Sequence, residues 1–179
     1  ISATAPFAVS GNICSLTHGD NFSQSGAEMP NVAFSGLFNV SEINDGIYSK
    51  NLIDASELYI GAYNELSWMC CQTMFYGCTH LLYAPDMSMF TSMDNNQGCD
   101  QMFQNCKCLS EGVDLGNLTN LHWRGCFGMY SGCSQLDKAV LPNVSDKSLS
   151  FDWWSSFGDF LDGTYSSGVL EADYSWNGL

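Results

Sequence analysis

The chain has 179 residues, of which 45% are hydrophobic, so it is long enough to bury one sizeable core. It carries 19 Asp and Glu against 5 Lys and Arg, a formal net charge of −14. Such a charge disfavours contact with nucleic-acid phosphates and with anionic membranes. No apolar run approaches the roughly 18 residues that a membrane span needs. We therefore expect no nucleic-acid partner and no membrane insertion of this chain.

An early copy of an internal repeat precedes the three clearest ones. The segment starting at Leu52 has the spacing of the segment starting at Leu81, and Leu37–Phe38 resembles a Met-Phe pair that recurs further on. An insertion of about eight residues, around 39–47, accounts for the longer distance between that pair and Leu52.

Three segments then share the pattern C-x-x-M-[FY]-x-[GN]-C-x-x-L without gaps, and their methionines are 28 and 27 residues apart. The recurring residues are Cys71, Met74, Phe75, Cys78 and Leu81, then Cys99, Met102, Phe103, Cys106 and Leu109, then Cys126, Met129, Tyr130, Cys133 and Leu136. A degenerate last copy uses Phe157. A unit of this length cannot bury its apolar face alone, so we expect neighbouring copies to stack.

The repeat predicts a local structure for each copy. Cys71, Met74, Phe75 and Cys78 have the spacing i, i+3, i+4 and i+7 of a short helix with one apolar face. The Gly or Asn before the second Cys of each unit tolerates positive φ and would end that helix: Gly77, Asn105 and Gly132. Each Leu then begins an extended stretch, and a small residue three positions later allows close packing.

The fold class that follows is an α/β repeat. We expect a short right-handed solenoid, similar to a leucine-rich repeat, with a parallel β-sheet on one face and short helical turns on the other. The sequence leaves open which column of residues lines the binding face.

The nine cysteines favour a structural interpretation, because six of them occupy two positions of the repeat and stacking would align them in two ladders. A free Cys is a compact hydrophobe that suits such ladders. Some rungs would also be close enough for disulfides. Zinc is disfavoured, because no two-residue-spaced pair is matched by a second pair, and we expect no cofactor.

The repeat resembles the BspA-type leucine-rich repeats of bacterial surface proteins, in particular the Met-Phe-x-Gly-Cys arrays of gut bacteria and their phages. The segment 9–16 is similar to that family's N-terminal cap, and the segment 152–165 is similar to the one that ends its arrays. The resemblance implies an N-terminal cap at 1–36, repeats at 37–150 and a C-terminal cap at 151–179, in one continuous domain. It further implies a location outside the cell, on a cell or virion surface, and binding rather than catalysis.

Two sets of side chains are candidates for binding. The first set lies five positions after the Leu anchors: Glu57, Asp86 and Asp114. Stacking would bring these carboxylates about 5 Å apart. They would then either hold Ca²⁺ or extend into solvent. Aromatic residues next to carboxylates could form a ligand patch, although core packing explains many of them equally well. The candidate ligand-binding residues are Tyr59, Tyr83, Glu111 and Asp137.

No motif supports catalysis: the three histidines share no spacing, and no phosphate-binding loop is present. We therefore expect a non-enzymatic recognition or adhesion module, with a protein or glycan partner on a host or neighbouring cell. The alternative is a structural domain of a larger assembly, such as a phage virion or a cell-surface appendage. The chain opens with Ile-Ser-Ala-Thr-Ala rather than Met, so we expect it to be part of a longer protein.

Overall fold

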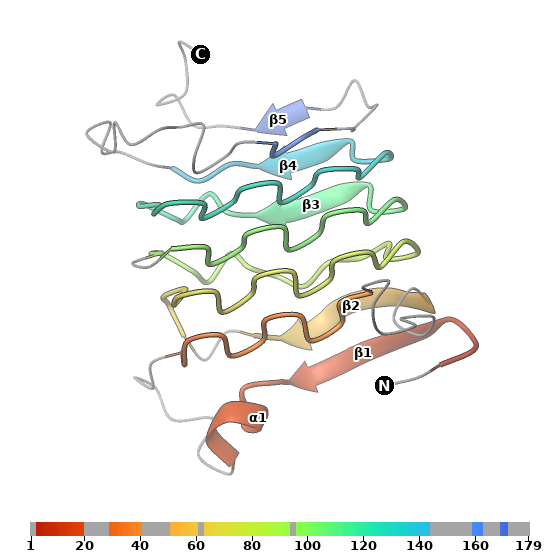
Figure 1. Cartoon of the computed structure of the whole chain (residues 1–179), viewed down its shortest axis with the longest axis horizontal. Helices are drawn as coiled ribbons and strands as arrows, with labels where there is room; N and C mark the ends of the chain where they lie inside the picture. The colour runs from red at the N-terminus through yellow and green to blue at the C-terminus, as the bar shows by residue number, and fades with distance from the viewer. Residues whose placement is uncertain are drawn as a thin grey trace.

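The computed structural model describes residues 3–19, 29–40, 51–60, 63–93, 96–143, 159–162 and 169–171. Its elements are β1 (Phe7–Asn12), α1 (Ser15–His18), β2 (Leu52–Tyr59), β3 (Glu111–Asp114), β4 (Lys138–Val140) and β5 (Val169–Glu171). The strands form two separate parallel sheets, β1–β2 and β3–β4–β5. Figure 1 shows the chain rising in layers from β1 at the bottom to β5 at the top, with wavy segments stacked one above another. The described residues include no helix long and apolar enough to cross a membrane.

The wavy segments are runs of tight turns, which we call the turn rows: residues 32–40, 68–78, 96–106 and 123–133. Within a row, every second N–H group donates to the carbonyl three residues earlier, as Met74 does to Cys71 at 3.2 Å. Positive φ recurs at every fourth residue, with 52° at Met69, 51° at Thr73 and 75° at Gly77.

The remaining N–H groups of a turn row donate to the next row. Cys71 donates to Gly98 at 2.9 Å, Thr73 to Asp100 at 2.9 Å, and Gly77 to Gln104 at 2.8 Å. Backbone N–H groups are costly to bury without a partner. Alternating bonds within and between rows satisfy them here with neither a helix nor a sheet.

The predicted fold class, an α/β solenoid similar to a leucine-rich repeat, is wrong. Its helical turns are missing: the one helix among the described residues is α1, four residues long and outside the turn rows. Its single sheet along one face is missing too, because the described strands form two short, separate sheets. A spacing of i, i+3, i+4 and i+7 fits a helix but equally fits turns that repeat every four residues. A positive φ at each fourth residue excludes the helix.

The same apolar positions are nevertheless buried, and the aromatic ones form a stack through the core. Ring centroids lie 5.3 Å apart from Phe38 to Phe75, 5.3 Å from Phe75 to Phe103, and 5.6 Å from Phe103 to Tyr130. The stack confirms that Phe38 is equivalent to the later aromatic residues. Phe160 extends it edge-on at 5.2 Å from Tyr130. Phe157, the residue that the sequence predicts for the last copy, lies outside the described residues.

The residues that follow each row confirm the prediction of close packing. The four anchors Leu52, Leu81, Leu109 and Leu136 are buried. A Cβ added to Gly112 would lie 2.7 Å from Tyr130 Oη, so the small residue three positions after Leu109 is a steric requirement.

All nine cysteines are free, and eight of them are buried. The thiols of the second repeat position donate to a carbonyl of the preceding row: Cys78 Sγ to Phe38 O at 3.3 Å, Cys106 Sγ to Phe75 O at 3.2 Å, and Cys133 Sγ to Phe103 O at 3.0 Å. Burial raises the pKa of the Cys78 and Cys133 thiols to about 12. The thiols thus act as hydrogen-bond donors between rows in this structure.

Candidate functional site

The first candidate site lies on the segments that follow the turn rows, and we call it the strand-side patch: Leu82, Tyr83, Glu111, Asp137 and Lys138. All five side chains are exposed, Tyr83 at 59% and Leu82 at 42%.

Backbone pairing aligns the patch with its neighbours in adjacent copies. Tyr83 forms a parallel bridge with Asp54, and Leu82 N donates to Ile53 O at 2.9 Å. Glu111 of β3 pairs with Lys138 of β4. The first and second positions after the Leu anchors are thus paired between the first and second copies and between the third and fourth. The second and third copies are joined further along, where Thr119 N donates to Thr91 O at 3.0 Å. The repeat frame therefore places these positions in two adjacent columns.

A three-residue burial period explains why both columns are exposed. In β2, Leu52, Ala55 and Leu58 are buried, and the two residues between each buried pair are not. In a regular strand, residues two apart share a face, so the second position after a buried Leu would be buried as well. Register shifts in the β1–β2 and β3–β4 pairings accompany the departure from that alternation.

The structure brings three of the four predicted ligand-binding residues into the patch: Tyr83, Glu111 and Asp137. Tyr59 is also exposed, at 47%, but lies at the far end of β2. It is five residues beyond Asp54, a distance of about 17 Å along a strand. Tyr59 is therefore not part of the same patch.

The calcium candidates do not form a metal site. Glu57, Asp86 and Asp114 are exposed, and the described part of the chain holds no group of three His, Cys, Asp or Glu side chains that could hold a metal ion. Asp86 Oδ1 accepts a hydrogen bond from Ser88 N at 2.8 Å, and Asp114 Oδ1 accepts one from Gly116 N at 2.7 Å. These two carboxylates stabilise local turns in the backbone.

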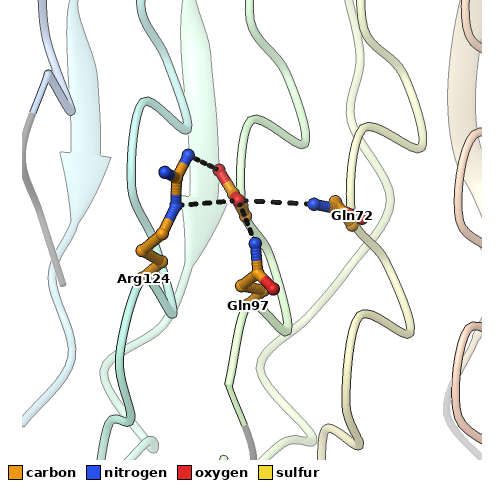
Figure 2. A network of polar contacts seen from close by, with 4 residues as sticks. Gln72, Gln97 and Arg124 are labelled. Carbon is orange, nitrogen blue, oxygen red and sulfur yellow. Dashed lines mark hydrogen bonds and ion pairs between the residues drawn. The ribbon is translucent and has the colours of Figure 1, made fainter. Parts of the chain in front are cut away.

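A polar network on the turn rows was not found from the sequence. Figure 2 shows Gln72, Gln97 and Arg124 around one shared carboxylate, which the hydrogen bonds identify as that of Asp100. Arg124 Nε lies 3.1 Å from Asp100 Oδ2, and Arg124 Nη2 lies 3.3 Å from Oδ1, which makes the pair bidentate. Gln97 Nε2 donates to Oδ2 at 3.0 Å and Gln72 Nε2 at 3.4 Å. The Asp100 carboxylate, 2% exposed, thus links three successive rows.

Two aromatic rings lie next to the Arg124 guanidinium of this network. Arg124 Cζ lies 4.0 Å from the Phe127 ring centroid and 5.6 Å from the Trp123 centroid. Trp123 is 48% exposed, and Trp68, in the equivalent position two rows earlier, is 43% exposed. One sequence signal for the exposed tryptophans was available. The position three residues before the first Cys of each copy holds Trp68, Asn96 and Trp123.

Comparison with protein-family models, curated proteins and solved structures finds no match.

Proposed function

We propose that the chain is a non-enzymatic recognition module that binds a protein partner through the strand-side patch. The observation that carries this proposal is the pair of exposed apolar side chains, Tyr83 at 59% and Leu82 at 42%, next to the charged side chains of Glu111, Asp137 and Lys138. An apolar anchor beside a polar rim is the usual organisation of a protein–protein interface.

The chemistry of the partner follows from the charge around the patch. The segments 51–60, 81–93, 109–121 and 136–143 carry six carboxylates and one lysine. A complementary surface has Lys or Arg side chains around a pocket that accepts Tyr83 and Leu82. Charge complementarity of this kind accelerates association and selects against acidic partners.

The scaffold supports such a role because it holds the patch on backbone that is bonded to its neighbours. Leu82 N donates to Ile53 O, and Asp137 N donates to Ser110 O at 2.7 Å. A patch that is already ordered loses less entropy on binding.

The experiment is a binding screen of the purified chain on an array of purified extracellular and cell-surface proteins, followed by titration of each hit. We expect at least one partner with a Kd of about 10 μM or tighter. The Leu82→Ala/Tyr83→Ala double variant should lose it by about tenfold or more. Raising the ionic strength to about 1 M, where the Debye length is about 3 Å, should also weaken binding of the native chain to the partner.

The matched control is Leu16→Ala, because Leu16 is 69% exposed and lies in α1, outside the patch. Hits that bind the double variant as well as the native chain would refute the proposal. A concentration-dependent oligomer in sedimentation analysis, with no partner on the array, would instead favour a structural domain of a larger assembly.

A further inference from the structure

A second surface, on the turn rows, has a chemistry that the strand-side patch lacks. Trp68, Asn96 and Trp123 hold equivalent positions in three successive rows, each three residues before the first repeat Cys. The rows are joined there by hydrogen bonds from Met69 N to Asn96 O at 3.2 Å and from Gln97 N to Trp123 O at 3.0 Å. We call these three residues the tryptophan column.

The two indoles of this column are exposed, and their backbones lie two rows apart. Trp68 is 43% exposed and Trp123 48%, although a large aromatic side chain gains most from burial. They are two rows apart, which is about 10 Å at the spacing of hydrogen-bonded backbones. Asn96, between them, is also exposed.

The turn rows that carry the column have no net charge, although the protein is strongly acidic. Asp100 and Arg124 are the only charged residues in the sequences of the four turn rows, and they neutralise each other. The other polar groups near the column include the half-buried amides of Gln72 and Gln97. An amide has two N–H donors and a carbonyl acceptor, so a single bond to Asp100 uses only part of its capacity.

The Asp100 network also orders one end of the column. It fixes the Arg124 guanidinium (Figure 2). That guanidinium lies 5.6 Å from the Trp123 centroid and 4.0 Å from that of Phe127. A guanidinium near an indole ring is attracted to its electron-rich face. Because the cation is held by a buried carboxylate, Trp123 is restricted before any ligand arrives, which reduces the entropic cost of binding.

From the tryptophan column and its neutral amide surroundings we infer a binding site for an uncharged, linear polysaccharide. The C–H faces of sugar rings pack on the electron-rich faces of indoles, and sugar hydroxyls pair with amide groups. Two indoles whose backbones are about 10 Å apart are within the span of a linear oligosaccharide of a few units. The balanced charge of the turn rows and the exposed carboxylate of Glu65, three residues before Trp68, give no preference for an anionic glycan. This inference concerns a different surface and ligand from the strand-side patch and does not depend on it.

The test is affinity electrophoresis of the native chain in gels that contain, one at a time, soluble β-glucan, mannan, xylan or amylose, with polygalacturonate as the anionic comparison. We expect retardation by at least one neutral polysaccharide and none by polygalacturonate. Trp68→Ala and Trp123→Ala should each weaken the interaction by about tenfold. Trp123→Phe, which keeps an aromatic face, should stay within about threefold of the native chain.

Tyr83→Ala is the matched control, because Tyr83 is an exposed aromatic residue on the strand-side patch, and it should bind polysaccharide like the native chain. Thermal melts establish that each variant is folded. Failure of all four neutral polysaccharides to retard the chain would overturn the inference, and so would a folded Trp68→Ala/Trp123→Ala double variant that binds normally. Neither result would affect the array test of the strand-side patch.

Discussion

The turn rows and the segments that follow them alternate along the chain, yet they differ in hydrogen bonding, packing and charge. In the turn rows, backbone bonds continue from row to row, rings and thiols stack inside, and the sequences hold one acidic and one basic residue, which pair. The segments 51–60, 81–93, 109–121 and 136–143 have only short strands or single bridges and carry six carboxylates and one lysine. Both regions supply buried core residues, as the Phe103 ring and the Leu81 and Leu109 anchors do. The difference indicates that only the exposed positions of the following segments are free to vary in surface chemistry.

The largest expected effect tests that division directly. Phe103→Ala removes a fully buried ring that stacks on Phe75 and Tyr130, and should lower the free energy of unfolding by about 3–5 kcal/mol. Leu82→Ala, on the exposed strand-side patch, should change it by less than about 0.5 kcal/mol. Urea denaturation of both variants provides the measurement. Similar losses in the two would contradict the division.

The next effect concerns the one ion pair of the turn rows. Arg124→Ala leaves the Asp100 carboxylate, 2% exposed, without its cation, and should cost about 3 kcal/mol. Lys138→Ala, whose side chain is exposed on β4, is the matched control and should cost less than about 0.5 kcal/mol. Chemical denaturation compares the two.

A double variant separates the cost of an unpaired charge from a loss of packing. Asp100→Asn combined with Arg124→Met should be more stable than Arg124→Ala, because it leaves no buried charge without a partner. A double variant as unstable as Arg124→Ala would attribute the loss to packing against Phe127 instead.

Substitutions at two glycines of one row distinguish the cost of backbone strain from the cost of a steric collision. Both have positive φ, 56° at Gly128 and 75° at Gly132. A Cβ at Gly128 would lie 3.4 Å from Gln101 Cγ, whereas a Cβ at Gly132 would collide with Asn105 Oδ1. We expect Gly128→Ala to cost about 1 kcal/mol and Gly132→Ala about 2 kcal/mol. Equal melting temperatures for the native chain and Gly132→Ala would show that the row does not need this conformation.

The last prediction is a dependence on alkaline pH that belongs to the turn rows. Burial raises the pKa of Cys78, Cys126 and Cys133 from 9.0 to about 12. Below pH 9 these thiols are protonated in both states, so they leave the stability unchanged. Between pH 9 and about 12 the unfolded chain ionises first. Each thiol should then lower the free energy of unfolding by about 1.4 kcal/mol per pH unit.

Urea unfolding at about pH 8, about pH 9.5 and about pH 11 measures this slope. Cys133→Ser should make it shallower by about the contribution of one thiol. Cys108→Ser is the matched control, because Cys108 is the one cysteine that is not fully buried. A stability that is flat to pH 11 would mean that the thiols are not protected from solvent as the structure has them.

Much of the layered organisation could be predicted from the recurrence of residues. The structure contains the repeat frame and the equivalence of Phe38 and Phe75. It also buries the Cys, Met and aromatic positions of the repeat. Positive φ occurs, as predicted, at Gly77, Asn105 and Gly132. These properties depend on the identity of single residues and on their spacing. Both are visible in the sequence.

The secondary structure and the second binding surface were decided by the tertiary structure. A period of four residues leaves the same apolar pattern as a helix, and only the bonds from each row to the next, such as Phe75 N to Met102 O at 2.9 Å, select turns. Asp100, Arg124 and Gln72 are up to 52 residues apart in sequence, and stacking alone brings them together. The physical reason is that residue type and spacing specify what must be buried, whereas hydrogen bonds between distant segments determine which backbone conformation buries it.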